Sequence, residues 1–194
     1  MGENKKIAQA TLTILIFTLF SRFLGFGREM AIAYRFGATG ITDAYLVAHA
    51  IPYIFDSIVG MTLATVIVPI FTGLTAQGRK EEAWKAMSTI VSGVAAFMVV
   101  IALVGIIGAP VVVQVLGGGF APATMDLAIR LTALMMPSIV FMALAGVLGG
   151  ILNANNIFGP PALGPALMNL VIILAAIIPG TWLGVYGLVL GTVL

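Results

Sequence analysis

Long apolar runs are the feature of this sequence that most constrains its fold. A helix needs about 20 mostly apolar residues to cross the hydrocarbon core of a membrane. Six apolar runs are separated by turns that contain Gly, Pro or polar residues, and they cover residues 7–34, 42–74, 83–108, 124–152, 162–178 and 183–194. The sequence therefore predicts an all-α fold, a polytopic transmembrane helix bundle of about six spans with the sixth incomplete.

The scarcity of charge supports this interpretation. Only 8% of the 194 residues are charged, whereas a soluble domain carries roughly a quarter. A soluble fold of this length would need more polar surface, so much of the surface must face lipid. The connections between the runs are short, and we expect residues 1–194 to form a single transmembrane unit.

Several classes of function are excluded by composition. The net charge of +2 is small and scattered, so nothing favours nucleic acid as a partner. One histidine and no cysteine leave no usual zinc set and no metal site. No glycine-rich phosphate loop with a following lysine is present, so there is no sign of ATP hydrolysis. We expect no enzyme, no catalytic residue and no cofactor; transport would use an Na⁺ or H⁺ gradient or the membrane potential.

The positions of the basic residues predict the orientation of the chain. Lys5 and Lys6 precede the first run, and Arg79, Lys80 and Lys85 follow the second. Basic residues are enriched in the cytoplasmic loops of membrane proteins. We therefore expect a multi-pass protein whose N-terminus lies in the cytoplasm.

The last run, 183–194, ends without a basic anchor, an aromatic belt or a polar tail. Membrane spans normally end at such an interface. The sequence favours a chain cut within its last span, and the alternative is a naturally short last helix.

Charged residues inside the apolar runs are the strongest indication of function. A charge at bilayer depth costs about 2.5 to 3.5 kcal/mol on insertion scales, and marks a functional cavity by default. Residues seven apart share one face of a helix. Ser21, Arg28 and Arg35 therefore lie in one line of the first run, and Arg22 and Glu29 lie in another.

The second run carries a matching polar line of Thr42, His49 and Asp56. Two neighbouring helices with polar stripes would enclose water or a polar substrate. We expect a water-accessible hollow shared by the first two helices, with Glu29, Asp43, Asp56 and His49 as candidate gating or coupling groups. Each carboxylate can instead have a purely structural role, and the histidine can be a packing hydrogen bond.

Structural alternatives exist for the other charges as well. Arg22 and Glu29 could form a buried pair that fixes helix packing, and Asp56 could neutralise Arg28 across the helix interface. Arg35 could extend its charge to the outer headgroups while its stem stays in the membrane.

Candidate hinges interrupt both helices. Gly25 and Gly27 lie between the two arginines, and Pro52 lies in the second run. Glycine inside a helix costs about 1 kcal/mol relative to alanine, and transporters commonly break helices where they bind substrate. The alternative for the glycines is close helix packing through small residues.

Several short motifs carry a family resemblance over nearly the whole chain. They are SRFLGFGRE at 21–29, RFGA at 35–38, TDAY at 42–45, IP at 51–52, VPI at 68–70, GILN at 150–153 with Asn156, and PALMN at 165–169. Together these resemble the N-terminal signature of the MurJ (MviN) family of the multidrug/oligosaccharidyl-lipid/polysaccharide exporter superfamily.

The resemblance implies a lipid II flippase of the bacterial cytoplasmic (inner) membrane. Such proteins have two six-helix lobes and two extra helices, and they move an undecaprenyl-pyrophosphate-linked peptidoglycan precursor by alternating access. This chain would be the N-terminal lobe without its C-terminal lobe. The resemblance aligns Arg22 and Arg28, beside Ser21, with the cavity residues that bind the pyrophosphate, and Asp43 with an acidic residue of the first loop.

The second run departs from the family pattern. Where many relatives carry basic residues and then Glu, this chain has Asp56, Ser57 and Met61. A carboxylate would repel a pyrophosphate, so either Asp56 pairs with Arg22 or Arg28, or the substrate differs. The alternatives are an exporter of another lipid-linked glycan, an ion-coupled drug exporter of the same superfamily, and a non-transporting membrane scaffold.

Overall fold

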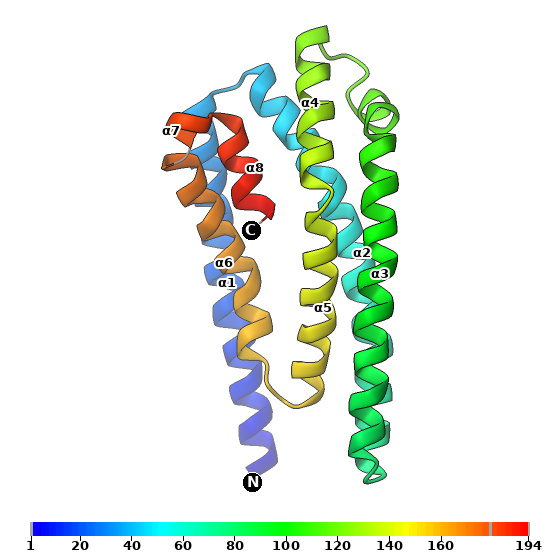
Figure 1. Cartoon of the computed structure of the whole chain (residues 1–194). Coiled ribbons are helices and arrows are strands. Elements are labelled where there is room, and N and C mark those ends of the chain that lie inside the picture. The colour runs from blue at the N-terminus through cyan, green and yellow to red at the C-terminus, as the bar shows by residue number, and fades with distance from the viewer. Residues whose placement is uncertain (1, 179, 194) are drawn as a thin grey trace.

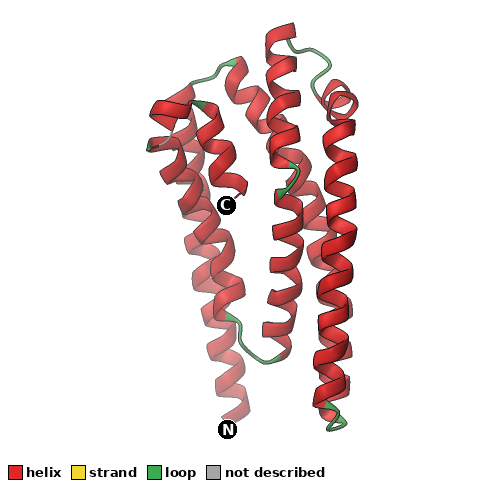
Figure 2. Cartoon of the chain, viewed as in Figure 1, coloured by secondary structure: helices red, strands yellow, loops and turns green. Residues whose placement is uncertain are grey.

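The protein is an all-helical bundle in the computed structural model (Figures 1 and 2). The structure describes the backbone of residues 2–178 and 180–193, and their side chains except those of 2–10, 56, 59–64 and 180–181. The predicted all-α fold is confirmed. The helices are α1 (Gly2–Phe36), α2 (Gly40–Ala76), α3 (Lys80–Leu116), α4 (Pro122–Met135), α5 (Ser138–Ala154), α6 (Gly159–Ile177), α7 (Gly180–Leu183) and α8 (Val185–Val193).

The long helices run up and down the bundle in sequence order (Figure 1). The start of α1, the turn between α2 and α3 and the loop between α5 and α6 lie at one end, at the bottom of the view. Both basic clusters predicted to flank the cytoplasmic face are thus attached to the same end. The direction in which this end faces across the membrane stays a prediction.

Three helices of the described part are long and apolar enough to cross a membrane, over Thr11–Phe36, Lys80–Leu116 and Gly159–Ile177. The α4–α5 pair would make a fourth span. These spans do not include α2, several of whose side chains lie outside the described set. The expected total of about six spans stays a prediction.

The expected single run over 124–152 is two helices, α4 and α5, which meet at 41°. Pro137 lies at the break, where its ring removes a backbone donor and disfavours a continuous helix. The Ser138 hydroxyl donates to the Met135 carbonyl at 2.7 Å, which satisfies a backbone group at the break. Such replacement of lost helix hydrogen bonds is what makes proline tolerable at membrane depth.

The helices pack in two groups that meet at the main core, and a second, smaller core joins α2, α3 and α5. α1 packs chiefly on α6, which also contacts α8, while α2 packs chiefly on α5 and α4. The first two helices are therefore not the close neighbours that the sequence analysis expected. The side chains of Tyr45, Leu131, Ile139, Ile172 and Leu188 are among those that fill the main core between the groups.

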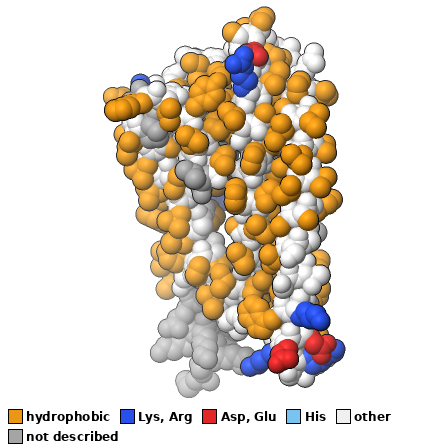
Figure 3. Space-filling view, in the orientation of Figure 1, with side chains coloured by type: hydrophobic (Ala, Val, Ile, Leu, Met, Phe, Trp, Pro, Cys, Tyr) orange, Lys and Arg blue, Asp and Glu red, His pale blue; other side chains and the backbone are white. Residues whose placement is uncertain are grey.

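The surface has the distribution expected in a membrane. Figure 3 shows hydrophobic side chains over the middle of the molecule and charged side chains gathered toward its two ends. At the lower end, Arg79 and Glu82 form an ion pair, and near the upper end Arg130 pairs with Asp126 at 2.8 Å. Apolar side chains at mid-height are exposed because lipid, not water, is their solvent.

Candidate functional site

Arg28 is the centre of a polar cluster on α1. Its Nε and Nη2 donate to one carboxylate oxygen of Glu29, at 3.2 Å and 2.6 Å. The Arg28 side chain keeps 24% of its surface exposed and that of Glu29 keeps 51%. The guanidinium is thus inside a candidate membrane span, paired with one carboxylate and still partly exposed.

The third member of the cluster comes from α6. Nη1 of Arg28 donates to Oδ1 of Asn169 at 3.2 Å. The Asn169 amide nitrogen donates to the backbone carbonyl of Ser21 at 3.1 Å and approaches the Ser21 hydroxyl at 3.5 Å. Ser21 and Arg28, which the helix period placed on one face, therefore meet the same side chain of another helix.

The glycines of α1 lie against this helix contact. A Cβ at Gly25 would lie 3.5 Å from the Asn169 amide nitrogen, and one at Gly27 would lie 3.6 Å from Ile173. α1 runs through both glycines, and α2 runs through the buried Pro52, without a break. The glycines fit the packing alternative in this conformation, and the hinge role of all three residues stays a prediction.

An aromatic column on α2 forms the second polar element. The rings of Tyr45 and His49 stack with centroids 5.8 Å apart, and those of His49 and Tyr53 stack at 6.2 Å. The buried Tyr45 hydroxyl is hydrogen-bonded to Thr192 of α8 at 3.2 Å. The column ties α2 to α8 at the inner end and reaches the exposed Tyr53 at the other.

The two polar elements lie within electrostatic range of each other. The charges of Arg28 and Glu29 act on His49 and on Tyr45. Burial nevertheless affects both groups more than these two charges, which act in opposite directions. α6 and α8 supply the hydrogen-bond partners of the two elements, and α1 packs on α6. A water-accessible hollow beside them stays a prediction.

The remaining candidates are spread along the same helices. Arg22 is exposed on α1, and in the described part of the chain it has no hydrogen-bond or ion-pair partner. Glu29 pairs with Arg28, so the expected alternative of an Arg22–Glu29 pair is wrong for this structure. Asp43 is exposed in the first turn of α2, where the helix dipole favours a carboxylate. The side chain of Asp56 lies outside the described residues, so its pairing with either arginine stays a prediction.

Thr42 and Arg35 lie where the first two helices meet their connecting turn. The Thr42 hydroxyl donates to the Gly37 carbonyl at 2.7 Å, which closes the turn. Gly37 has a φ of +66°, a left-handed conformation that glycine adopts without strain. Arg35 is exposed in the last turn of α1, where a cation stabilises the helix end.

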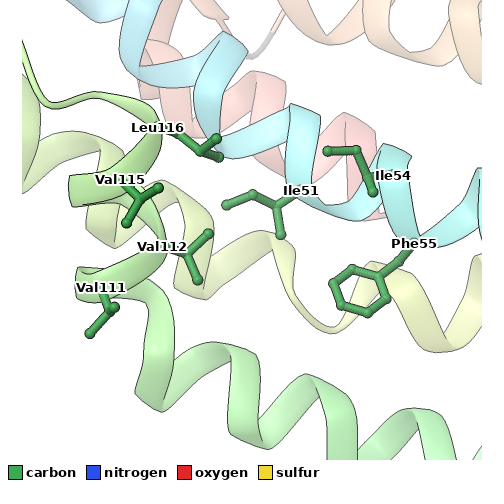
Figure 4. A pocket seen from close by; sticks show the side chains of 7 residues that line it. All are labelled: Ile51, Ile54, Phe55, Val111, Val112, Val115 and Leu116. Atoms are coloured by element: carbon green, nitrogen blue, oxygen red, sulfur yellow. The ribbon is translucent and has the colours of Figure 1, made fainter.

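A cavity of about 340 Å³ between α2 and α3 is apolar throughout (Figure 4). It is lined by Ile51, Ile54, Phe55, Val111, Val112, Val115 and Leu116. None of these side chains can donate a hydrogen bond to an anionic group. The Arg28 cluster, and not this cavity, is therefore the candidate site for a polar ligand. Among the described residues, no group of three potential ligands could hold a metal ion.

Sequence reasoning gave no role to three residues of the site, Asn169, Tyr45 and Thr192. A signal for Asn169 was present, because it is the one polar side chain within 162–178. A polar side chain in such a run faces a partner or a cavity in most membrane proteins. Tyr45 and Thr192 gave no comparable signal, since both residue types are common in helices of this kind.

Comparisons with known proteins identify the family. A family model described as lipid II flippase MurJ matches residues 32–194. The lipid II flippase MurJ of Burkholderia cenocepacia is 36% identical over 173 residues, which are 87% of this chain and 33% of that protein. That of Thermosipho africanus is 29% identical over 186 residues, or 95% of this chain and 37% of that protein. The chain thus spans about a third of the length of these relatives.

The polar segment of α1 precedes the match of the family model. The alignment with the Thermosipho africanus protein covers 95% of this chain, and it therefore includes this polar segment. A solved structure of a lipid II flippase MurJ, in an inward closed conformation, superposes with a TM-score of 0.78 at 28% identity over 94% of this chain and 39% of that chain. The chain therefore belongs to the MurJ family of lipid II flippases, membrane transporters rather than enzymes.

Proposed function

We propose that this chain forms the N-terminal lobe of a lipid II flippase in the bacterial cytoplasmic membrane. In this proposal Arg28 contacts the pyrophosphate of the lipid-linked cargo. The observation that carries it is a guanidinium at membrane depth, on a candidate span, that keeps 24% of its side chain exposed. A charge that served packing alone would be enclosed by its partners.

The chemistry of the guanidinium suits a diphosphate. Its planar fork can donate two parallel hydrogen bonds to phosphate oxygens, where lysine offers only a point charge. Glu29 now occupies the Nε–Nη2 edge and keeps the pair neutral overall. Neutral pairing lowers the cost of holding a charge in the membrane while no cargo is bound.

The other predicted residues take supporting roles in this proposal. Arg22 is a second cationic contact on α1, while Asp43, Asp56 and His49 are gating or coupling groups. The N-terminus lies in the cytoplasm, and a C-terminal lobe completes the transport pathway by alternating access.

A chimera tests the proposal. This chain would replace the corresponding third of the Burkholderia cenocepacia flippase, and the chimera would be expressed in a strain depleted of its own lipid II flippase. We expect growth with the unmodified chimera and none with Arg28→Ala, because the cargo contact is lost. Arg28→Lys should restore growth only weakly, since it keeps the charge without the fork.

Immunoblots of the membrane fraction control for insertion, and the exposed pair Arg130–Asp126 supplies a matched control in Arg130→Ala. Full growth with Arg28→Ala would refute the cargo contact. A chimera that reaches the membrane but never supports growth would instead favour a different lipid-linked glycan, a drug, or a scaffold role.

A further inference from the structure

We infer that Asn169 is a positioning residue for Arg28, and that Glu29 is an exchangeable occupant of the edge that Asn169 turns toward an anionic ligand. The inference rests on the proposed function for the nature of that ligand. In the structure, the Arg28 guanidinium makes three hydrogen bonds, one to Asn169 and two to Glu29. The inference takes the first contact as fixed and the second as exchangeable.

The guanidinium is divided between two neighbours of different charge. Its Nη1 donates to the neutral Asn169 amide of α6, and its Nε–Nη2 edge donates to the Glu29 carboxylate of α1. That edge can form a fork to an anion, and it is the edge that Asn169, bound to Nη1, does not contact. An asparagine holds the opposite nitrogen without adding a negative charge that would compete with a phosphate.

Asn169 is itself fixed on α1 at two points. Its amide nitrogen donates to the Ser21 carbonyl at 3.1 Å, and a carbonyl can only accept. The amide oxygen must therefore face Arg28, which can only donate. Gly25 lies beside this contact, where an added Cβ would be in ordinary van der Waals contact with the amide nitrogen, at 3.5 Å.

Glu29 has fewer described neighbours than Asn169, although its pair with Arg28 is the shorter contact. It is half exposed, and its described polar contact is the neighbouring Arg28 alone. An incoming anion with two oxygens would form the fork with Arg28 while Glu29 turns into the open space beside it. The guanidinium keeps its place during the exchange because Asn169 still holds Nη1.

The whole chain in lipid nanodiscs, with inorganic pyrophosphate as the probe, allows both parts to be measured. Calorimetric titration gives the affinity, and ¹⁵N-arginine labelling gives the Nε–Hε signal of Arg28. The sequence has five arginines, so loss of one signal in Arg28→Lys assigns it. The variants are Asn169→Ala, Asn169→Asp and Glu29→Gln, with Asn155→Ala as the matched control because its amide bonds only locally to Ile151.

We expect Asn169→Ala to weaken pyrophosphate binding about tenfold, the size expected for a lost hydrogen bond to a charged group. The Arg28 signal should also move and broaden as the side chain gains freedom. Glu29→Gln should strengthen binding severalfold, since a competing charge is gone. Asn155→Ala should leave both the affinity and the signal as in the wild type.

An unchanged affinity and an unchanged Arg28 signal in Asn169→Ala would overturn the inference. If that variant fails to fold, Asn169→Asp decides, because it keeps the oxygen that accepts from Arg28. It should hold the Arg28 signal sharp yet weaken pyrophosphate binding, and wild-type affinity there would overturn the inference. If the wild type binds no pyrophosphate, the proposed cargo contact fails, while the Arg28 signal of the ligand-free Asn169→Ala chain still judges the positioning role.

Discussion

Polar side chains at the depth of the apolar belt form pairs between helices that are distant in sequence. Arg28 joins Asn169 between α1 and α6, and Tyr45 joins Thr192 between α2 and α8. Water is not available in hydrocarbon to replace a missing partner, so each such bond favours one arrangement of the helices. Measured bonds of this kind between membrane helices average about 0.6 kcal/mol.

Tyr45→Phe tests the second of these pairs. The Thr192 hydroxyl already donates to the Leu188 carbonyl, so Tyr45 is the donor in their shared bond. Removing it should lower the free energy of unfolding by about 0.6 kcal/mol and lower the midpoint of thermal unfolding in detergent by roughly 1 to 2 degrees. Tyr34→Phe is the control, because Tyr34 is 93% exposed. Equal midpoints for the two variants would contradict the pair's role.

Helix contacts in this bundle depend on small residues at defined positions. Gly191 of α8 lies against Ala175 of α6, and a Cβ at 191 would overlap the Ala175 side chain. Small residues let membrane helices approach closely, and dispersion forces then stabilise the contact. Gly25 and Gly27 of α1 also face α6, but an added Cβ at either position would make only an ordinary van der Waals contact.

Gly191→Ala is expected to push α8 away from α6. Overpacking of this kind costs typically about 1 to 3 kcal/mol, more than alanine gains in helix propensity. Gly93→Ala in α3 is the matched control, since nothing lies within 4 Å of the added Cβ, and propensity there favours alanine by about 1 kcal/mol. Thermal unfolding in detergent should therefore move down for the first variant and up or not at all for the second. A stabilising Gly191→Ala would contradict the close contact.

On the face of the molecule drawn in Figure 3, hydrophobic side chains cover the middle and charged side chains gather toward the two ends. The turn after α2 and the loop after α5 lie at one end, and the loop after α3 lies at the other (Figure 1). Basic residues gather at the first of these ends, and the positive-inside rule therefore predicts that this end faces the cytoplasm. The topology of the entire chain follows once one end is placed.

Single cysteines can place the ends, because the natural sequence has none. We expect Gln77→Cys and Ile157→Cys to react with a membrane-impermeant maleimide only after the cells are permeabilised. Gly119→Cys, in the loop after α3, should react in intact cells, and a Cβ there meets nothing within 4 Å. Labelling of 77 and 119 from the same side would contradict the bundle topology, and a reversed pattern would contradict the orientation.

Much of this fold could be predicted from the sequence, and the failures have physical causes. The helices cover the apolar runs, because lipid leaves the backbone no alternative to internal hydrogen bonds. The sequence did not distinguish Pro137, where the helix breaks, from Pro52 and Pro69, which lie inside the continuous and equally apolar α2. Proline in a run therefore does not by itself reveal where a membrane helix divides.

For the candidate site, the sequence by itself determined that Ser21 and Arg28 share a face, since the helical period alone fixes it. Only the tertiary structure decided which side chains of other helices face Ser21 and Arg28. Asn169 is 141 residues from Arg28 in sequence, and Glu29 pairs with the adjacent Arg28 instead of Arg22. The physical reason is that periodicity orients a side chain around its own helix axis, whereas the packing of α6 on α1 selects the partner it meets.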